Sequence, residues 1–121
     1  MKELNGKNCI ITGAANGIGR SFAFALAKEG MNLYLTDIDL KNLNKLETEI
    51  LQFGPKVYSI KCDVTKLEDW THISENFHSK FENLDLLINN AGIAIGGNIL
   101  AITLDDWKEV LDVNLWGIYV P

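Results

Sequence analysis

Three glycines at a fixed spacing follow the first apolar run of the chain. Residues Asn8–Gly19 read NCIITGAANGIG, with Gly13, Gly17 and Gly19 between an expected strand and an expected helix. Such a turn presents backbone N–H groups and a helix N-terminus, which together bind a pyrophosphate. Gly13 permits the tight turn, Gly17 lets backbone approach phosphate, and Gly19 allows the helix to pack closely on the strand. The pattern predicts nucleotide binding, and a ligand-free glycine turn is the alternative.

An acidic residue ends the second expected strand. Asp37 lies 24 positions after Gly13, where a carboxylate can accept hydrogen bonds from the adenosine ribose and repel a 2′-phosphate. Asn16 and Ile38, at which a cation would serve a 2′-phosphate, are not basic. The sequence therefore favours NAD over NADP as the cofactor. An ordinary turn aspartate, with Asp39 as a rival N-cap of the next helix, is the alternative.

Two further groups lie at the ends of later strands. Asp63, followed by Val64, comes after the third expected strand and could meet the adenine amino group, although a solvated loop acid fits nearly as well. The stretch 89–92 reads NNAG and ends the fourth expected strand, at the switch point where ligands bind in open α/β sheets. Taken alone, NNAG could also be an ordinary turn.

Asn114 falls on the apolar face of the last expected helix. Its apolar stripe is formed by Trp107, Val110, Leu111 and Ile118. We expect this stripe to be buried in the complete fold, but Trp107, Leu111 and Ile118 to be exposed here, where later elements should pack. A buried amide without partners costs about 1–3 kcal/mol, so Asn114 must be hydrogen-bonded. It either ties the helix to a neighbouring segment or distorts the helix and orders water beside an active site.

The elements that must position these groups alternate between apolar strands and amphipathic helices, which is typical of an α/β fold. Short connections and right-handed crossovers favour a doubly wound, Rossmann-type parallel sheet with the strand order 3-2-1-4. Because the complete fold has six strands, we expect a sheet that is incomplete on its C-terminal side. The expected strands are 8–12, 31–36, 56–61 and 84–89, and the expected helices are 17–29, 40–53, one beginning after residue 65, and 103 to about 119.

Caps and faces support these helices. Thr65 with Glu68, and Thr103 with Asp106, have the spacing of capping boxes. The residues that share one face are Ile18, Phe22 and Leu26 in the first helix, Leu43, Leu46 and Ile50 in the second, and Trp70, Ile73, Phe77 and Phe81 in the third.

Composition limits the function classes. The 121 residues are 47% hydrophobic and 22% charged, as in a single soluble globular domain. The net charge of -5 argues against nucleic acid and against an anionic membrane surface as partners. The N-terminus lacks the apolar core of a signal peptide, and we expect no membrane span. Cys9 and Cys62 are expected on strands too far apart to bridge, as reduced thiols of a cytoplasmic protein. The spacing of His72 and His78 does not stack them on one helix face, so we expect no metal site.

Taken together, the motifs resemble the classical short-chain dehydrogenase/reductase family. The resemblance implies an NAD-dependent oxidoreductase that transfers hydride between an alcohol and a ketone, and that is a homo-oligomer at full length. It also implies that Asn114 supports a water-linked proton relay. The motifs that match in order and spacing are 12–19, 63–64, 89–92 and 113–117. The cofactor-binding residues that it implies are Thr12, Gly13, Asn16, Gly17, Ile18, Gly19, Asp37, Asp63, Val64, Asn90, Ala91 and Gly92.

The chain departs from this family at the acid/base group. The family uses a Tyr with a Lys four residues later, assisted by a Ser, but none of Tyr34, Tyr58 and Tyr119 has a lysine at that spacing. We therefore expect residues 1–121 to be one NAD-binding domain, truncated before the catalytic residues and inactive alone. A non-catalytic NAD-binding sensor or regulatory module is the alternative, and a structural subunit with a vestigial turn is another.

Overall fold

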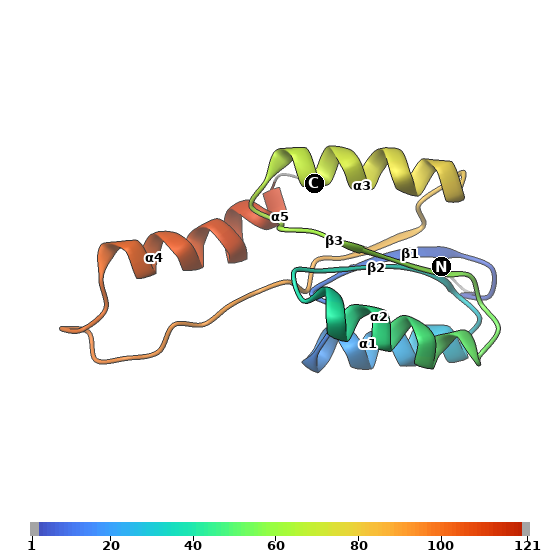
Figure 1. The fold of residues 1–121 in the computed structure, drawn as a ribbon, viewed down its shortest axis with the longest axis horizontal. Coiled ribbons are helices and arrows are strands. Elements are labelled where there is room, and N and C mark those ends of the chain that lie inside the picture. Colours follow the sequence, from blue (N-terminus) through green and yellow to red (C-terminus); the bar gives the residue numbers. More distant parts are fainter. Residues whose placement is uncertain (1–2, 120–121) are drawn as a thin grey trace.

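A four-stranded parallel sheet forms the central layer of the computed structural model, which describes residues 3–119 (Figure 1). The ends of the predicted 1–121 domain, residues 1–2 and 120–121, lie outside the described residues. The strands are β1 (Asn8–Thr12), β2 (Asn32–Asp37), β3 (Val57–Lys61) and β4 (Leu86–Ile88). Their order is β3-β2-β1-β4, and every neighbouring pair is parallel. The predicted Rossmann-type α/β fold and its strand order are confirmed.

Helices cover both faces of the sheet. The helices α1 (Gly17–Lys28) and α2 (Leu40–Leu51) lie on one face, and α3 (Leu67–Lys80) lies on the other (Figure 1). Two hydrophobic clusters fill the spaces between these layers. The predicted core faces of α2 and α3 are confirmed, because the buried residues are Leu43, Leu46 and Ile50 in α2 and Trp70, Ile73 and Phe77 in α3, with Phe81 buried just after it.

The packing of α1 differs from the pattern of its large apolar residues. Its buried residues are Gly19, Ala23 and Ala27, whereas Ile18 and Phe22 are 69% and 42% exposed. Small side chains at i, i+4 and i+8 let the helix backbone lie close to the sheet. Of the predicted row, only Leu26 is partly buried against the core, whereas Ile18 and Phe22 lie off the face that packs on the sheet.

The start of α3 corrects a predicted cap. The capping box of Thr65 and Glu68 is not formed, because α3 has Lys66 as its N-cap, without a side-chain hydrogen bond. The backbone N–H and the hydroxyl of Thr65 both donate to Asp63 Oδ1, at 3.0 and 2.6 Å. The carboxylate thus binds the hydroxyl in a local turn that competes with capping.

The predicted helix 103–119 is divided into three segments. They are α4 (Leu104–Leu111), a π-helical segment η1 (Asp112–Trp116) and α5 (Gly117–Tyr119). The second predicted capping box is confirmed, since the N–H of Asp106 donates to Thr103 Oγ1 at 3.1 Å and the N–H of Thr103 donates to Asp106 Oδ2 at 2.9 Å.

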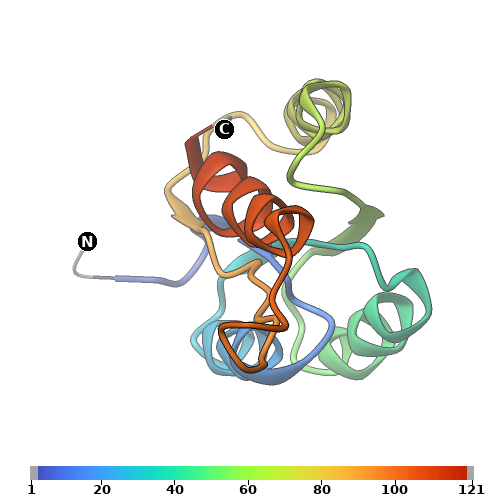
Figure 2. The same cartoon turned by 90° about the vertical axis from the view of Figure 1, so that its left-hand side faces the viewer.

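The apolar stripe on this helix is exposed in the 121-residue chain, as expected for an incomplete fold. The helix α4 projects away from the sheet beyond the strand ends (Figures 1 and 2). Trp107 and Leu111 are 54% and 51% exposed, and Ile118 is also exposed. Within residues 3–119, no element covers this face, and β4, the strand that precedes α4, lies at the edge of the sheet.

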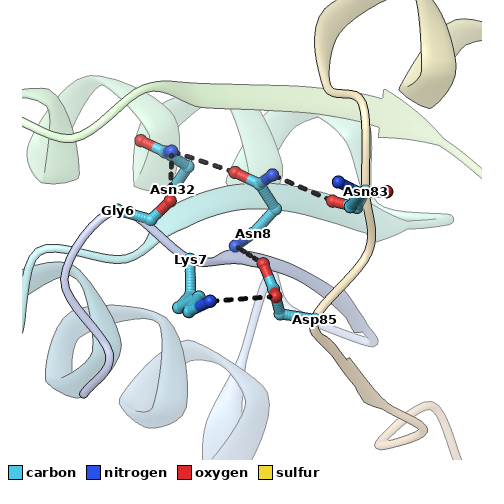
Figure 3. A network of polar contacts seen from close by, with 6 residues as sticks. All are labelled: Gly6, Lys7, Asn8, Asn32, Asn83 and Asp85. Carbon is cyan, nitrogen blue, oxygen red and sulfur yellow. Dashed lines mark hydrogen bonds and ion pairs between the residues drawn. The ribbon is translucent and has the colours of Figure 1, made fainter.

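A polar network joins the strands at their amino ends (Figure 3). The backbone N–H of Asn8 donates to Asp85 Oδ2, and its side-chain amide donates to the carbonyl of Asn83, both at 2.9 Å. Asn32 donates to Asn8 Oδ1 at 2.9 Å, and Lys7 pairs with Asp85 at 3.6 Å. These contacts hold the segment before β4 beside β1, and the ladder itself is shorter than predicted, with three residues.

Both cysteines are buried and free, on β1 and just after β3, with β2 between them, as predicted. Burial raises the pKa of Cys9 to about 12. Burial, together with the carboxylates of Asp69 and Asp63, also raises the pKa of Cys62 to about 12. In the described part of the chain, no helix is both long and apolar enough to cross a membrane.

Candidate functional site

A cleft of about 730 Å³ lies at the carboxyl ends of the strands. Loops that follow all four strands line it on one side, and α4 with η1 lines it on the other. The predicted site residues Thr12, Gly19 and Asn114 lie outside this lining. The cleft brings together the other predicted residues, which are Gly13, Asn16, Gly17, Ile18, Asp37, Asp63, Val64, Asn90, Ala91 and Gly92.

The three glycines of the first turn differ in their surroundings. A Cβ at Gly13, where φ is +64°, would lie 2.8 Å from the Cα of Ala91, and one at Gly19 would overlap the carbonyl of Gly13. Gly17 has a φ of +58°, but a Cβ there would meet nothing within 4 Å. Gly13 and Gly19 thus permit close packing, whereas the backbone at Gly17 faces open space on the cleft and fits a phosphate group.

Thr12 joins the glycine turn to the NNAG segment. Its buried hydroxyl accepts the backbone N–H groups of Asn90 and Ala91, both at 3.0 Å, and donates to the carbonyl of Ile88 at 3.4 Å. The side-chain amide of Asn90 donates to the carbonyl of Gly13 at 3.1 Å. These bonds hold the ends of β1 and β4 together, so the NNAG segment forms part of the cleft wall.

Asp37 connects the first two strand-to-helix turns. Its Oδ2 accepts the backbone N–H of Ala15, and its Oδ1 accepts the backbone N–H of Asp39, both at 2.9 Å. The N-cap of α2 is Asp39, whose side chain accepts the N–H of Asn42 at 3.1 Å. Asp37 is therefore not needed as the cap, and its carboxylate lines the cleft.

Asp63 and Val64 form the part of the wall that follows β3. Burial raises the pKa of Asp63, but the hydroxyl and backbone N–H of Thr65 lower it more, so the pKa lies below its ordinary value. The carboxylate is thus charged at neutral pH. Val64 lies against α5, where a Cβ at Gly117 would come within 2.6 Å of its side chain.

Asn114 ties the π-helical segment to the loop after β4. Its Oδ1 accepts the backbone N–H of Ile93, and its Nδ2 donates to the carbonyl of the same residue, both at 2.8 Å. The amide thus ties the helix to a neighbouring segment, which is the first of the two roles predicted from the sequence. It also lies in a π-helical segment, so the helix is distorted there, as the second predicted role requires. A part in proton relay stays a prediction.

The opposite wall contains residues that the sequence analysis missed. Lys108 is the single basic side chain of the lining, within residues 3–119. A capping box at residue 103 followed by acidic residues one turn apart could have indicated a polar helix face. The charged residues that α4 and η1 contribute to the cleft are Asp105, Lys108, Glu109 and Asp112.

Comparison with known proteins agrees with this geometry. The family model described as short chain dehydrogenase matches residues 7–120. The chain is 41% identical over 115 residues to a CLA biosynthesis dehydrogenase/reductase of Lactiplantibacillus plantarum, across 95% of this chain and 40% of that protein.

Solved structures of similar proteins include complexes with nicotinamide nucleotides. A short chain dehydrogenase/reductase from Burkholderia phymatum in complex with NAD has a TM-score of 0.93 and 33% identity, covering 99% of this chain and 43% of its own. An alcohol dehydrogenase from the archaeon Thermococcus sibiricus, complexed with 5-hydroxy-NADP, has a TM-score of 0.91 and 31% identity, covering 96% and 50%. The chain spans half or less of the length of these three relatives.

Proposed function

The chain belongs to the short-chain dehydrogenase family, and we propose that it is the cofactor-binding half of an NAD-dependent oxidoreductase. The observation that carries the proposal is the cleft, which has an open glycine, Gly17, at the N-terminus of α1 and a carboxylate, Asp37, at the end of β2. The first fits a pyrophosphate and the second fits the ribose hydroxyls of an adenosine. The bound nicotinamide would supply the hydride chemistry, and this chain would position it.

Different residues around the cleft would bind different parts of the cofactor. The backbone from Gly13 to Gly19 would hold the pyrophosphate, Asp37 the ribose, and Asp63 with Val64 the adenine. The NNAG segment would lie along the cofactor, where the bonds from Thr12 keep it rigid. The full set of proposed binding residues is Thr12, Gly13, Asn16, Gly17, Ile18, Gly19, Asp37, Asp63, Val64, Asn90, Ala91 and Gly92.

The reaction of the whole protein is proposed as hydride transfer between an alcohol and a ketone, in a cytoplasmic homo-oligomer. Asn114 would support the proton relay through the π-helical segment that it shapes. The acid/base would be a Tyr with a Lys four positions later, a pair that the 121 residues do not contain. We therefore expect these residues alone to bind NAD weakly at most and to show no turnover.

Titration of the complete natural protein with NAD and NADP tests the proposal. NAD should bind about tenfold more tightly or better, because the carboxylate of Asp37 repels a 2′-phosphate. The substitution Asp37→Ala should narrow this gap, and Glu29→Gln, an exposed charge at the far end of α1, is the matched control. Equal or tighter binding of NADP contradicts the NAD assignment. NAD binding without turnover of any alcohol by the complete protein favours a sensor or regulatory module instead.

A further inference from the structure

Two carboxylates attach the glycine-rich loop to the turn between β2 and α2. Asp37 accepts the backbone N–H of Ala15 at 2.9 Å. Asp39 accepts the side-chain amide of Asn16 at 3.3 Å through its Oδ2. The loop is thus held at two consecutive residues, by side chains that are two positions apart in the sequence.

The side chain of Asn16 does not cap the helix that it precedes. Asn16 is the N-cap of α1, but its side chain makes no capping hydrogen bond with that helix. It lines the cleft and donates to Asp39 instead. A neutral amide therefore occupies the position at which a basic side chain would serve a 2′-phosphate, and a carboxylate holds it there.

Asp39 is fixed and ionised. Its Oδ1 accepts the backbone N–H of Asn42 at 3.1 Å, and its Oδ2 accepts the side-chain amide of Asn42 at 2.6 Å. The backbone N–H of Asn42, followed by that side-chain amide, lowers the pKa of Asp39 below its ordinary value. At neutral pH, Asp39 thus adds a second stationary negative charge beside Asp37.

Lys41, two residues after Asp39, is close enough to help lower the pKa of Asp39, but the basic residue of the first turn of α1 does not face these charges. Arg20, in the first turn of α1, forms an ion pair with Glu49 of α2. Its guanidinium also lies 4.9 Å from the ring centre of Phe24. Arg20 is therefore held along the outer side of α1 and α2 by contacts that do not involve the cleft.

We propose that Asp39 is a positioning residue for cofactor selection, which holds Asn16 at the cleft and rejects a 2′-phosphate together with Asp37. The inference rests on the proposed function, because it presupposes that the cleft binds the adenosine half of NAD. It assigns the selectivity to two carboxylates rather than to the strand-end carboxylate alone. Loss of either charge should leave part of the discrimination in place.

Neutral substitutions that keep the helix cap provide the test. Asn and Ser both serve as N-caps, so Asp39→Asn and Asp39→Ser remove the charge while α2 keeps its start. In each variant of the complete natural protein, the ratio of the dissociation constants for NADP and NAD should fall by about threefold to tenfold. The affinity for NAD should change by less than the affinity for NADP, because Asp39 reaches NAD only through Asn16 and does not itself line the cleft.

Salt dependence separates charge from a structural effect. In the unsubstituted protein, the ratio of the dissociation constants for NADP and NAD should fall as ionic strength rises, because salt screens the repulsion between the carboxylates and the 2′-phosphate. In Asp39→Asn this dependence should be weaker, and in the double variant Asp37→Asn/Asp39→Asn it should be nearly absent. The control Glu29→Gln should keep both the ratio and its salt dependence.

The outcomes distinguish the inference from its premise. If Asp37→Asn shifts the ratio but both Asp39 variants keep that of the unsubstituted protein, the inference is wrong and the proposed function stands. A fall in NAD affinity equal to the change for NADP also contradicts the inference, because it indicates a general structural role. If the unsubstituted protein binds neither nucleotide, the proposed function fails and the inference fails with it.

Discussion

A single amide, Asn114, satisfies both polar groups of one backbone residue. Its two hydrogen bonds to Ile93 close a ring between η1 and the loop after β4. The same loop begins with the NNAG segment that lines the cleft. The position of the cleft wall therefore depends on this amide, whether or not the amide also takes part in proton relay.

Replacement of this amide should lower stability and turnover. We expect Asn114→Ala to reduce the free energy of unfolding by about 1–3 kcal/mol, because both Ile93 groups lose their partner. In the complete natural protein, it should reduce kcat more than NAD affinity. Urea denaturation, NAD titration and steady-state kinetics measure the three effects, with the exposed Gln52→Ala as control. A variant that loses NAD affinity but keeps kcat would return Asn114 to a purely structural role.

The glycines of the first turn offer a matched pair. Gly19→Ala should reduce the free energy of unfolding by about 1–3 kcal/mol, because its methyl group would overlap the carbonyl of Gly13. Gly17→Ala has open space and should lose only the roughly 1–2 kcal/mol of a left-handed backbone, but it should weaken NAD binding more. Denaturation and titration of both variants check this. Equal losses of stability and affinity in the two variants would contradict the different roles.

The site residues that the sequence could predict are those at the carboxyl ends of strands, because the strand assignment alone places them at the cleft. Gly13 follows β1 directly, Asp37 is the last residue of β2, and Asp63 lies two residues after β3. All three line the cleft. The contribution of Lys108 could not be predicted, because it depends on the direction in which α4 leaves the sheet. The two roles of Asn114 could not be separated for a similar reason, since its partner Ile93 is 21 residues away.

At the scale of elements, prediction succeeded where local signals and packing agree. The faces of α2 and α3 and the capping box of α4 follow from residue spacing, and the structure has all three. The face of α1 was not recognisable, because close packing on the sheet selects small residues over large ones. A distortion of the last helix at Asn114 was one of two alternatives from the sequence, but it could not be selected, since the tie between Asn114 and Ile93 spans two elements.

The exposed face of α4 should drive association of the 121-residue chain. Trp107 and Leu111 lie on this face with about half of each side chain exposed, and adjoining apolar surface of this kind promotes association. We expect Trp107→Gln/Leu111→Gln to shift the chain toward monomer in size exclusion with light scattering, at unchanged thermal stability. In contrast, Leu43→Gln, which places a polar side chain in the core, should lower the thermal stability until the chain unfolds. A clean monomer before substitution would contradict the expectation.

At the scale of the whole molecule, both thiols report on global unfolding. Cys9 and Cys62 have pKa values raised to about 12 by burial, whereas unfolding returns each to an ordinary value of about 8.5. Above about pH 8.5 the unfolded state binds fewer protons than the folded state. The contribution of the thiols to the free energy of unfolding is therefore fully present below about pH 8.5 and is lost as pH rises toward 12.

This sign gives a measurable pH dependence. The midpoint of urea denaturation should decrease above about pH 8.5, and the decrease should be smaller in Cys9→Ala/Cys62→Ala. Alkylation of the thiols at pH 7 should be as slow as unfolding itself, because both side chains are buried. Rapid alkylation of the folded chain would show that the two clusters open locally. The exposed Ser79→Cys would serve as a fast-reacting control.

The two walls of the cleft differ in how they are anchored. The glycine turn extends from β1, which pairs on both sides and is nearly all buried, while α4 projects from the sheet. Local opening affects segments with few buried contacts first, so it can release α4 while β1 stays intact. In the 121-residue chain, we therefore expect the α4 wall to open while the glycine turn keeps its shape, so that a nucleotide bound to this chain alone would contact one firmly anchored wall.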